Sequence, residues 1–152
     1  MIRELYMEEL RNALELIWNT FIEFEAPEYS NEGIQEFKNY IEFKDIKEKV
    51  IKSELLMWGC FDNNKIIGVI ATSKKPCHIN MLFVDREYHK QGIASRLFNK
   101  ALEHYKANTE YSEMTVNSSP YAQDFYRKIG FKDTDKEKTI NGIRFIPMKY
   151  EF

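Results

Sequence analysis

The sequence predicts a mixed α/β (α+β) domain. Three features predict this class: two helical patterns at the start of the chain, three consecutive strand patterns joined by short turns, and a strand–helix–strand passage that closes with a hairpin. The chain has 152 residues, enough to bury a sizeable core, and contains no repeat, low-complexity tract or flexible linker. One domain over residues 1–152 is therefore expected.

The first part of the chain predicts a short strand and two helices. MIREL suits a strand, and apolar residues then recur at helical spacing, namely Leu10, Leu14, Ile17 and Phe21. Pro27 interrupts this helix, and Ser30 or Asn31 can cap a second helix that continues past Phe37 and Ile41. This helical segment is expected to cover one face of the sheet or to form a lid.

The pattern then changes to strands. ELLMWGCF and KIIGVIATS, separated by the polar turn DNNK, predict a hairpin, and CHINMLFV predicts a third strand. The next helix has an apolar face made of Ile93, Leu97, Phe98, Ala101, Leu102 and Tyr105. EMTVN predicts a strand, PYAQDFYRKI a short helix that stops at Gly130, and the Asn-Gly of KTINGIRFIPMKYEF a closing hairpin. Pro147 predicts an edge or a bulge in the last strand.

Composition and charge argue against several classes of function. Apolar residues make up 43% of the chain and aromatic residues 14%, which is typical of a folded globule. The net charge of −2 gives no field that would recruit nucleic acid or an acidic membrane. Two cysteines without CxxC or metal-ligand spacing predict neither a metal site nor a disulfide framework. The absence of a signal peptide and of a membrane-spanning run predicts a cytoplasmic protein. The expectation for its oligomeric state is a monomer or a homodimer.

The turn EYHKQGIASRL, residues 87–97, has the properties of a phosphate-binding loop. It joins the apolar strand INMLFV to a helix, and Gly92 lets the backbone bend and approach a ligand because it lacks a Cβ. Ala94 keeps the same approach clear. The helix that begins near Ile93 directs free N–H groups and its positive dipole end at the turn.

The surrounding string MLFVDREYHKQGIASRLFNKAL resembles the acetyl-CoA-binding motif of the GNAT superfamily of N-acetyltransferases. In that motif a strand leads into an [RQ]-x-x-G-x-[GA] turn, which HKQGIA matches at Gly92 and Ala94, with His89 in the Arg/Gln place. TVNSSPYAQDFYRKIGF resembles the next motif of the family and matches it at Tyr126, Gly130 and Phe131. The resemblance implies a central, mostly antiparallel, splayed sheet of about six to seven strands flanked by about four helices.

The resemblance also implies a site for acetyl-CoA as co-substrate. Backbone N–H groups of the turn would hold the pyrophosphate, and main-chain groups of Met81 to Val84 would pair with the pantetheine amides. The family often carries Asn where this chain has Ser119, and Asn117 lies two positions earlier. The expected cofactor-binding residues are Met81, Leu82, Phe83, Val84, His89, Lys90, Gln91, Gly92, Ile93, Ala94, Ser95, Asn117, Ser119 and Tyr126.

Acetyl transfer to an amine needs a base for the amine and an acid for the departing thiolate. The resemblance implies Tyr126 as the general acid. A backbone N–H at the end of MLFV would stabilise the oxyanion. His78 on the central strand is the first candidate for the base, ahead of Glu23, Glu25 and Glu28 in the N-terminal segment and of a water chain. The segment FIEFEAPEYS, which contains these glutamates, is expected to line an acceptor pocket suited to a cationic substrate, or to be a packed connection between helices.

Two functions of different classes follow. The first is an N-acetyltransferase that transfers an acetyl group from acetyl-CoA to a primary amine of a small molecule, peptide or protein by direct attack. The second is a non-catalytic module that binds acyl-CoA or a protein partner. Tyr126 and the intact turn favour the enzyme.

Overall fold

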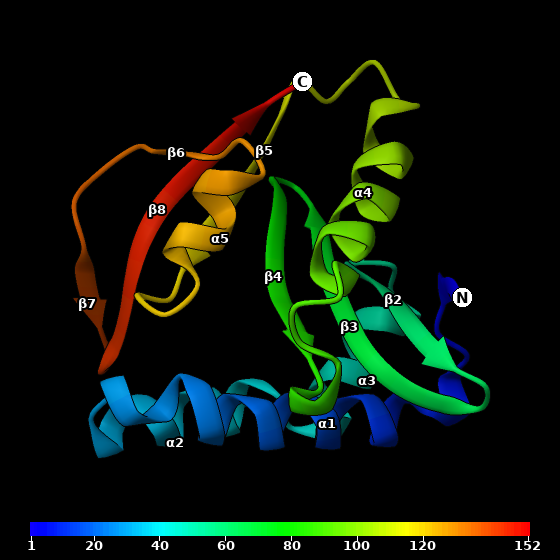
Figure 1. Ribbon diagram of the computed structural model, residues 1–152, viewed down its shortest axis with the longest axis horizontal. Coiled ribbons are helices and arrows are strands. Elements are labelled where there is room, and N and C mark those ends of the chain that lie inside the picture. Colours follow the sequence, from blue (N-terminus) through cyan, green and yellow to red (C-terminus); the bar gives the residue numbers. More distant parts are fainter.

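The computed structural model describes all residues 1–152 and contains one eight-stranded sheet with helices on both faces (Figure 1). The strands pair in the order β1-β2-β3-β4-β5-β8-β6, with β7 paired to β8. The pairings are antiparallel except for β4 with β5. The fold class predicted from the sequence is confirmed. The strands are β1 (Ile2–Glu4), β2 (Leu55–Asp62), β3 (Lys65–Lys74), β4 (Cys77–Val84), β5 (Glu113–Ser118), β6 (Lys132–Asp133), β7 (Lys138–Ile140) and β8 (Ile143–Glu151).

Five α-helices accompany the sheet, one more than the sequence predicts. The long second helical pattern is divided, because Glu42 adopts an extended conformation (φ −53°, ψ 127°). The turn before it brings Ile41 into the core. The α-helices are α1 (Leu10–Phe24), α2 (Asn31–Tyr40), α3 (Phe43–Ile51), α4 (Ile93–Lys106) and α5 (Gln123–Lys128). None of them combines the length and the apolar character that a membrane span requires.

Two apolar cores lie on opposite faces of the sheet. One lies under α4 and α5, and the other lies between the sheet and helices α1 to α3. All six residues predicted for the apolar face of α4 are buried, as are the four predicted for α1. Burying such a face stabilises each helix by roughly 1.5–3 kcal/mol per large side chain. The helical periodicity of the sequence therefore correctly predicted the buried faces of α1 and α4, which pack on opposite faces of the sheet.

Strand β4 contains a β-bulge that the sequence pattern does not reveal. Its register with β3 shifts between the pairs Ala71↔Met81 and Thr72↔Ile79, so Asn80 is the extra residue. Before the bulge Ile79 faces the core under α4, whereas Met81 faces the core under α1. Strict alternation would place both on one face, so the bulge reverses the side-chain directions of β4 at Asn80.

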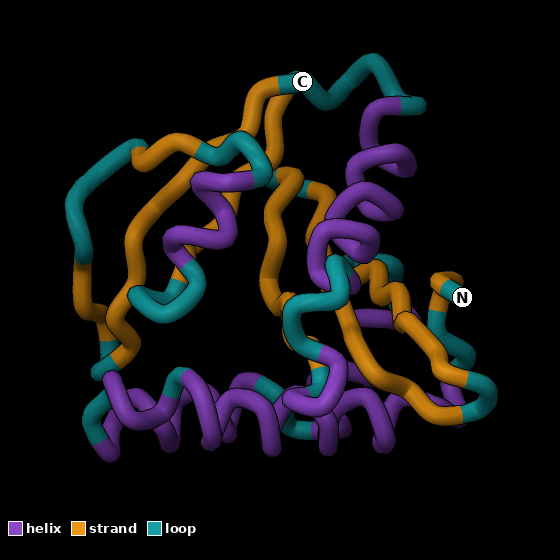
Figure 2. Tube along the Cα trace, in the orientation of Figure 1, coloured by secondary structure: helices purple, strands orange, loops and turns teal.

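The sheet splays between β4 and β5. These two strands pair only at His78↔Thr115 and Ile79↔Val116, after which they diverge. Figure 1 and Figure 2 show the separation: β4 lies with α4 on one side, and β5 and β8 lie with α5 on the other, while α1 and α2 run along the same edge of both halves. The splay leaves the second half of β4 without a strand neighbour on its inner side.

The closing hairpin returns to the N-terminal helices. Its turn is formed by Asn141 (φ 53°) and Gly142 (φ 79°), as the Asn-Gly pair predicted. Gly142 packs directly against Gly33 of α2, and the carbonyl of Arg144 accepts a hydrogen bond from the Tyr29 hydroxyl at 3.2 Å. These contacts close the far side of the splay.

Pro147 lies neither on an edge strand nor at a bulge, contrary to the prediction. Strand β8 lies between β5 and β6, and Pro147 pairs in regular register with Asn117. The imide nitrogen is tolerated because β7 pairs only as far as Phe145 and β6 begins at Met148. The Pro147 carbonyl still accepts a hydrogen bond from the N–H of Thr134 at 2.8 Å.

Candidate active site

Two adjoining cavities occupy the splay. One, here called the turn cavity, measures about 460 Å³ and is lined by β4, the turn before α4 and the start of α5. The other, here called the aromatic cavity, measures about 420 Å³ and lies between α1, α2, β4, β5 and the β8 hairpin. Five residues line both cavities and mark their junction, namely Glu25, Leu82, Phe83, Ala122 and Tyr126.

The turn cavity ends at the predicted phosphate loop. Gly92 is the N-cap of α4 and has φ 75°, a left-handed conformation that favours glycine, and a Cβ there would point into open space. The first N–H groups of α4 have no partner within the helix, and Ile93, Ala94 and Ser95 line the cavity. Lys90 adds a positive charge to the same lining. This end of the cavity therefore has the chemistry of an anion site. Gln91, also predicted here, does not line it.

Strand β4 presents free main-chain groups to the turn cavity. The N–H of Asp85 donates to the carbonyl of Ile67 at 2.8 Å, which sets the alternation of the β3–β4 ladder. By that alternation the main-chain groups of Met81 and Phe83 bond to β3, whereas those of Leu82 and Val84 point into the splay. An extended amide chain can pair with Leu82 there as an added strand would.

His89 has a structural partner in this turn. Its Nε2 lies 2.7 Å from the Val84 carbonyl, so this nitrogen donates the hydrogen bond. Its ring packs on Phe24 with centroids 4.8 Å apart, and Phe24 stacks in turn on Tyr121 at 5.3 Å. The imidazole thus ties the end of β4 to the turn and occupies the Val84 carbonyl.

Tyr126, the predicted general acid, lies at the junction of the two cavities. Its side chain is 5% exposed and packs against Phe125 and Phe131. Burial, reinforced by the nearby carboxylate of Glu25, raises the pKa of Tyr126 above its ordinary value. The phenol therefore keeps its proton at neutral pH and can donate it.

Glu25 differs from the nearby Glu23 and Glu28 because burial raises its pKa. It follows α1 directly and reaches the same junction as Tyr126. Burial raises the pKa of Glu25 to about 7, and the charge of Glu28 adds to this, while the hydroxyl of Ser119 opposes it. Glu23, by contrast, pairs with Arg86 on the surface at 3.4 Å. The sequence did not distinguish these three glutamates, whereas in the structure Glu25 alone of the three lines the two cavities.

His78, the other candidate base, lies away from the junction. It lines the aromatic cavity alone, and its Nδ1 is 2.7 Å from the Thr115 hydroxyl across the short β4–β5 pairing. Burial lowers the pKa of His78, so the ring is neutral at neutral pH. The side chain bridges the two strands at the point where they begin to diverge.

Asn117 and Ser119 line the aromatic cavity rather than the turn cavity. Ser119 is buried at the end of β5, where its hydroxyl accepts a hydrogen bond from the N–H of Ala122 at 3.2 Å. This bond organises the turn that leads into α5. The structure therefore brings most of the predicted cofactor residues to the turn cavity, whereas Met81, Asn117 and Ser119 line the aromatic cavity alone.

Comparison with known proteins agrees with this geometry. A family model described as an acetyltransferase (GNAT) domain matches residues 25–152. The chain belongs to the GNAT family of acetyltransferases. The matched region contains both sequence motifs and both cavities, apart from residues of α1 before Glu25. The family resemblance predicted from the two motifs is confirmed.

A curated relative gives a further match over part of the chain. The protein, named Uncharacterized N-acetyltransferase YafP, comes from Escherichia coli (strain K12) and is 34% identical over 92 residues. The match covers 60% of this GNAT chain and 55% of the relative. The chain therefore spans about half the length of this relative.

Solved GNAT structures share the whole fold. The PaiA N-acetyltransferase of Thermoplasma acidophilum, crystallised with coenzyme A, superposes with a TM-score of 0.85 at 23% identity and covers 100% of this chain and 98% of its own. An aminoglycoside 6'-N-acetyltransferase, also in complex with coenzyme A, gives a TM-score of 0.70 at 16% identity and covers 99% and 96%. At these identities the likeness establishes the fold.

Proposed function

We propose that this GNAT protein transfers an acetyl group from acetyl-CoA to a primary amine by direct attack of the amine. One observation carries the proposal: the turn cavity and the aromatic cavity meet where Glu25 and Tyr126 lie side by side with Leu82. A base and an acid thus stand at the only point that ligands in both cavities would share. Transfer without a covalent enzyme intermediate needs that arrangement.

The turn cavity fits acetyl-CoA on three counts. The N–H groups at the start of α4 suit the pyrophosphate, the open space beside Gly92 lets it approach, and the free main-chain groups of Leu82 suit the pantetheine amides. When bound, acetyl-CoA supplies an acetyl thioester. We assign binding to the residues around this path and keep Asn117 and Ser119 on the acceptor side.

Glu25 acts as the base in this proposal, in preference to His78. A primary amine has a pKa of about 10.4 and enters largely protonated, so a group must accept its proton before the nitrogen attacks. With a pKa of about 7, Glu25 is half ionised at neutral pH and accepts protons more readily than an ordinary carboxylate. It also lies at the junction, whereas His78 does not.

Tyr126 acts as the acid. As the carbon–sulfur bond breaks, the Tyr126 hydroxyl gives its proton to the departing thiolate. The substrate ammonium loses two protons in one turnover: the first passes through Glu25 to solvent before the nitrogen attacks, and the second, released from the nitrogen after attack, returns Tyr126 to its phenol form. The products are the acetylated amine, the free thiol of coenzyme A and one proton in solvent. Because burial raises the pKa of Tyr126, its phenol is protonated at every physiological pH.

Thiol release from acetyl-CoA against a panel of primary amines tests the proposal, with calorimetric binding of acetyl-CoA measured in parallel. Amine-dependent thiol release that is stoichiometric with an acetylated product supports it. Acetyl-CoA binding without release for any amine would indicate the non-catalytic acyl-CoA module instead. Absence of binding would remove the assignment of the turn cavity.

A further inference from the structure

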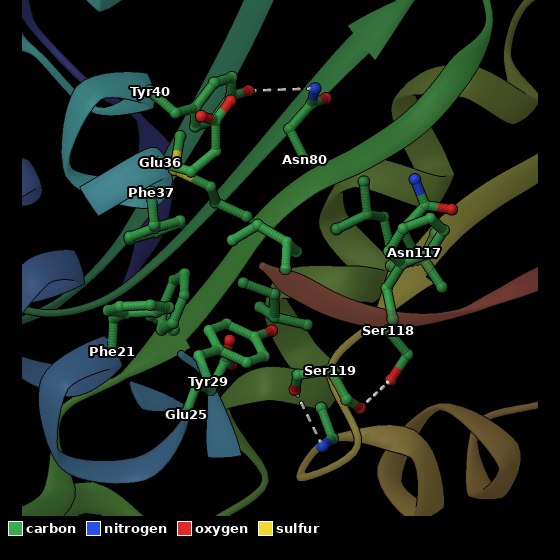
Figure 3. A pocket seen from close by; sticks show the side chains of 18 of the residues that line it. Phe21, Glu25, Tyr29, Glu36, Phe37, Tyr40, Asn80, Asn117, Ser118 and Ser119 are labelled. Carbon is green, nitrogen blue, oxygen red and sulfur yellow. Dashed lines mark hydrogen bonds between the residues drawn. The ribbon is translucent and has the colours of Figure 1, made fainter. Parts of the chain in front are cut away.

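The aromatic cavity has two polar ends separated by an apolar wall (Figure 3). Glu25, Tyr29 and Ser119 lie at the end that adjoins the turn cavity. Glu36, Tyr40 and Asn80 lie together at the opposite end. The proposed chemistry uses only the first end, so the second needs its own explanation.

The wall between the two ends is built from stacked rings. Phe21 and Phe37 are parallel within 17° and have centroids 4.0 Å apart, and Phe37 continues toward Tyr40 at 6.4 Å. Such a surface packs against methylene groups and gains about 0.8 kcal/mol for each one removed from water. It has no polar group of its own to recognise the middle of a ligand.

Asn80 leaves a hydrogen-bond acceptor without a partner at the distal end. Its Nδ2 donates to the Tyr40 hydroxyl at 3.3 Å, whereas its Oδ1 is buried and has no partner. The bulge in β4 directs this side chain into the cavity. A buried carbonyl oxygen without a donor is costly, so this position favours a ligand that brings an N–H group.

The charged lining of the cavity is entirely acidic. Two carboxylates, Glu25 and Glu36, line it together with no lysine or arginine. Neither carboxylate takes part in a salt bridge within the protein. Lys49 lies over the Tyr40 ring, with its Nζ 4.6 Å from the centroid, but it lines a separate surface groove. The cavity therefore selects cations, and it offers one carboxylate at each end.

We propose that the acceptor is a linear diamine. One nitrogen is acetylated at Glu25 and Tyr126, the methylene chain lies along the half-buried Phe37 ring, which the fully buried Phe21 supports from behind, and the second ammonium donates to Asn80 Oδ1 beside Glu36. This inference rests on the proposed acetyl transfer and specifies its substrate class. The distal contacts hold the second nitrogen and leave the first free to react.

The substrate test compares acceptors of equal chain length that differ only at the far end. We expect the α,ω-diamine to exceed the alkyl monoamine by roughly 10- to 100-fold in kcat/KM, the effect of a charge-assisted hydrogen bond. The amino alcohol, which keeps a donor but lacks the charge, should fall between them. The ω-amino carboxylate should be the poorest, because its negative end meets Glu36. A diamine no better than the monoamine at any chain length would overturn the inference.

Two variants locate the preference at the distal end. Glu36→Gln should lower kcat/KM for the diamine roughly 10-fold and leave the monoamine unchanged, since Glu36 is on the surface of α2 and away from the reacting atoms. Asn80→Leu should do the same, and Asn80→Asp, which keeps an acceptor oxygen, should restore the diamine preference. Glu32→Gln, in the same helix but outside the cavity, is the matched control. A diamine preference unchanged in both Glu36→Gln and Asn80→Leu would also overturn the inference.

The outcomes separate this inference from the proposed function. If no amine of any kind releases thiol, acetyl transfer itself is wrong, and the diamine inference falls with it. If monoamines or peptide amines are acetylated as well as diamines, acetyl transfer stands and only the substrate class is wrong.

Discussion

Tyr126 has a hydroxyl whose loss can be tested without disturbing the fold. Its ring fills the core under α4 and α5, and phenylalanine keeps the ring while removing the proton. We expect Tyr126→Phe to lower kcat by about 10- to 1000-fold, with acetyl-CoA affinity nearly unchanged. Steady-state kinetics and calorimetry measure the two quantities. Full activity in this variant would dismiss Tyr126 as the acid.

The raised pKa of Glu25 leads to a prediction about how kcat/KM depends on pH. Because its pKa is raised to about 7 and the ionised form is the base, kcat/KM should rise as pH increases through about 7. Glu25→Gln should lose this step and most of the activity, while Glu23→Gln, whose carboxylate lies in a surface ion pair, should keep both. A pH step that survives in Glu25→Gln would assign it to another group, and His78→Gln would then be the variant to examine.

The same shift affects stability in the opposite direction. The folded protein binds the Glu25 proton more tightly than the unfolded chain, whose carboxyl titrates near 4.5. The contribution of protonated Glu25 to the free energy of unfolding is fully present below about pH 4.5 and is lost as pH rises through about 7. Glu25→Gln should therefore melt at a higher temperature than the wild type at alkaline pH, with a smaller difference in acid. Equal shifts at both pH values would contradict the raised pKa.

At the scale of elements, the sequence predicted features that depend on neighbouring residues and missed features that depend on contacts between distant residues. The turn before α4 could be predicted from a few adjacent residues. A backbone that is to approach a ligand closely favours small residues, and Gly92 and Ala94 are such residues. The bulge at Asn80 has no such signature: CHINMLFV matches an uninterrupted strand, and only pairing with β3 reveals the extra residue. The burial of Glu25 depends likewise on residues far along the chain, such as Ser119.

The contact between α2 and the β7–β8 turn yields a prediction about the aromatic cavity. A Cβ on Gly33 would overlap the Gly142 carbonyl oxygen, so Gly33→Ala must push the turn away from α2. We expect a loss of about 1–3 kcal/mol in the free energy of unfolding, as for other overpacked sites. KM for the amine should also rise, because Asn141 and Ile143 line the aromatic cavity, whereas acetyl-CoA affinity should hold.

Gly59→Ala is the control for this change. A Cβ there meets the ends of the Leu5 and Phe61 side chains, which can move, and the site is remote from both cavities. It should lower stability without changing KM for the amine. A Gly33→Ala protein with an unchanged KM would show that the hairpin turn does not shape the acceptor site.

At the scale of the whole molecule, more of the turn cavity than of the aromatic cavity could be predicted from the sequence. The turn cavity is lined largely by two continuous stretches that carry the family motifs, whereas the aromatic cavity gathers Phe37, Asn80, Asn117 and Phe145 from four separate elements. No spacing along the chain connects those four. The sheet topology alone brings them together, and with them Tyr40 and Glu36, which the sequence did not single out.

The splayed sheet also predicts how the molecule responds to coenzyme A. The halves that carry β4 and β5 pair through only two residue pairs, and the main-chain groups of Leu82 face the gap. A ligand that lies along β4 should slow hydrogen exchange at the Leu82 amide, which has no strand partner, far more than at the Phe83 amide, which already bonds to β3. Residue-resolved exchange with and without coenzyme A measures the difference.

Gly92→Val provides the control, because its side chain fills the open space beside the turn and should abolish coenzyme A binding and the protection with it. The wild type should also gain about 2.7 kcal/mol of stability at roughly 100 times Kd, because the ligand binds only the folded chain. Protection confined to the first turn of α4, with none at Leu82, would mean that coenzyme A contacts the turn but does not lie along β4. The acetyl group would then not reach Glu25 and Tyr126, so this measurement bears on the whole proposed arrangement.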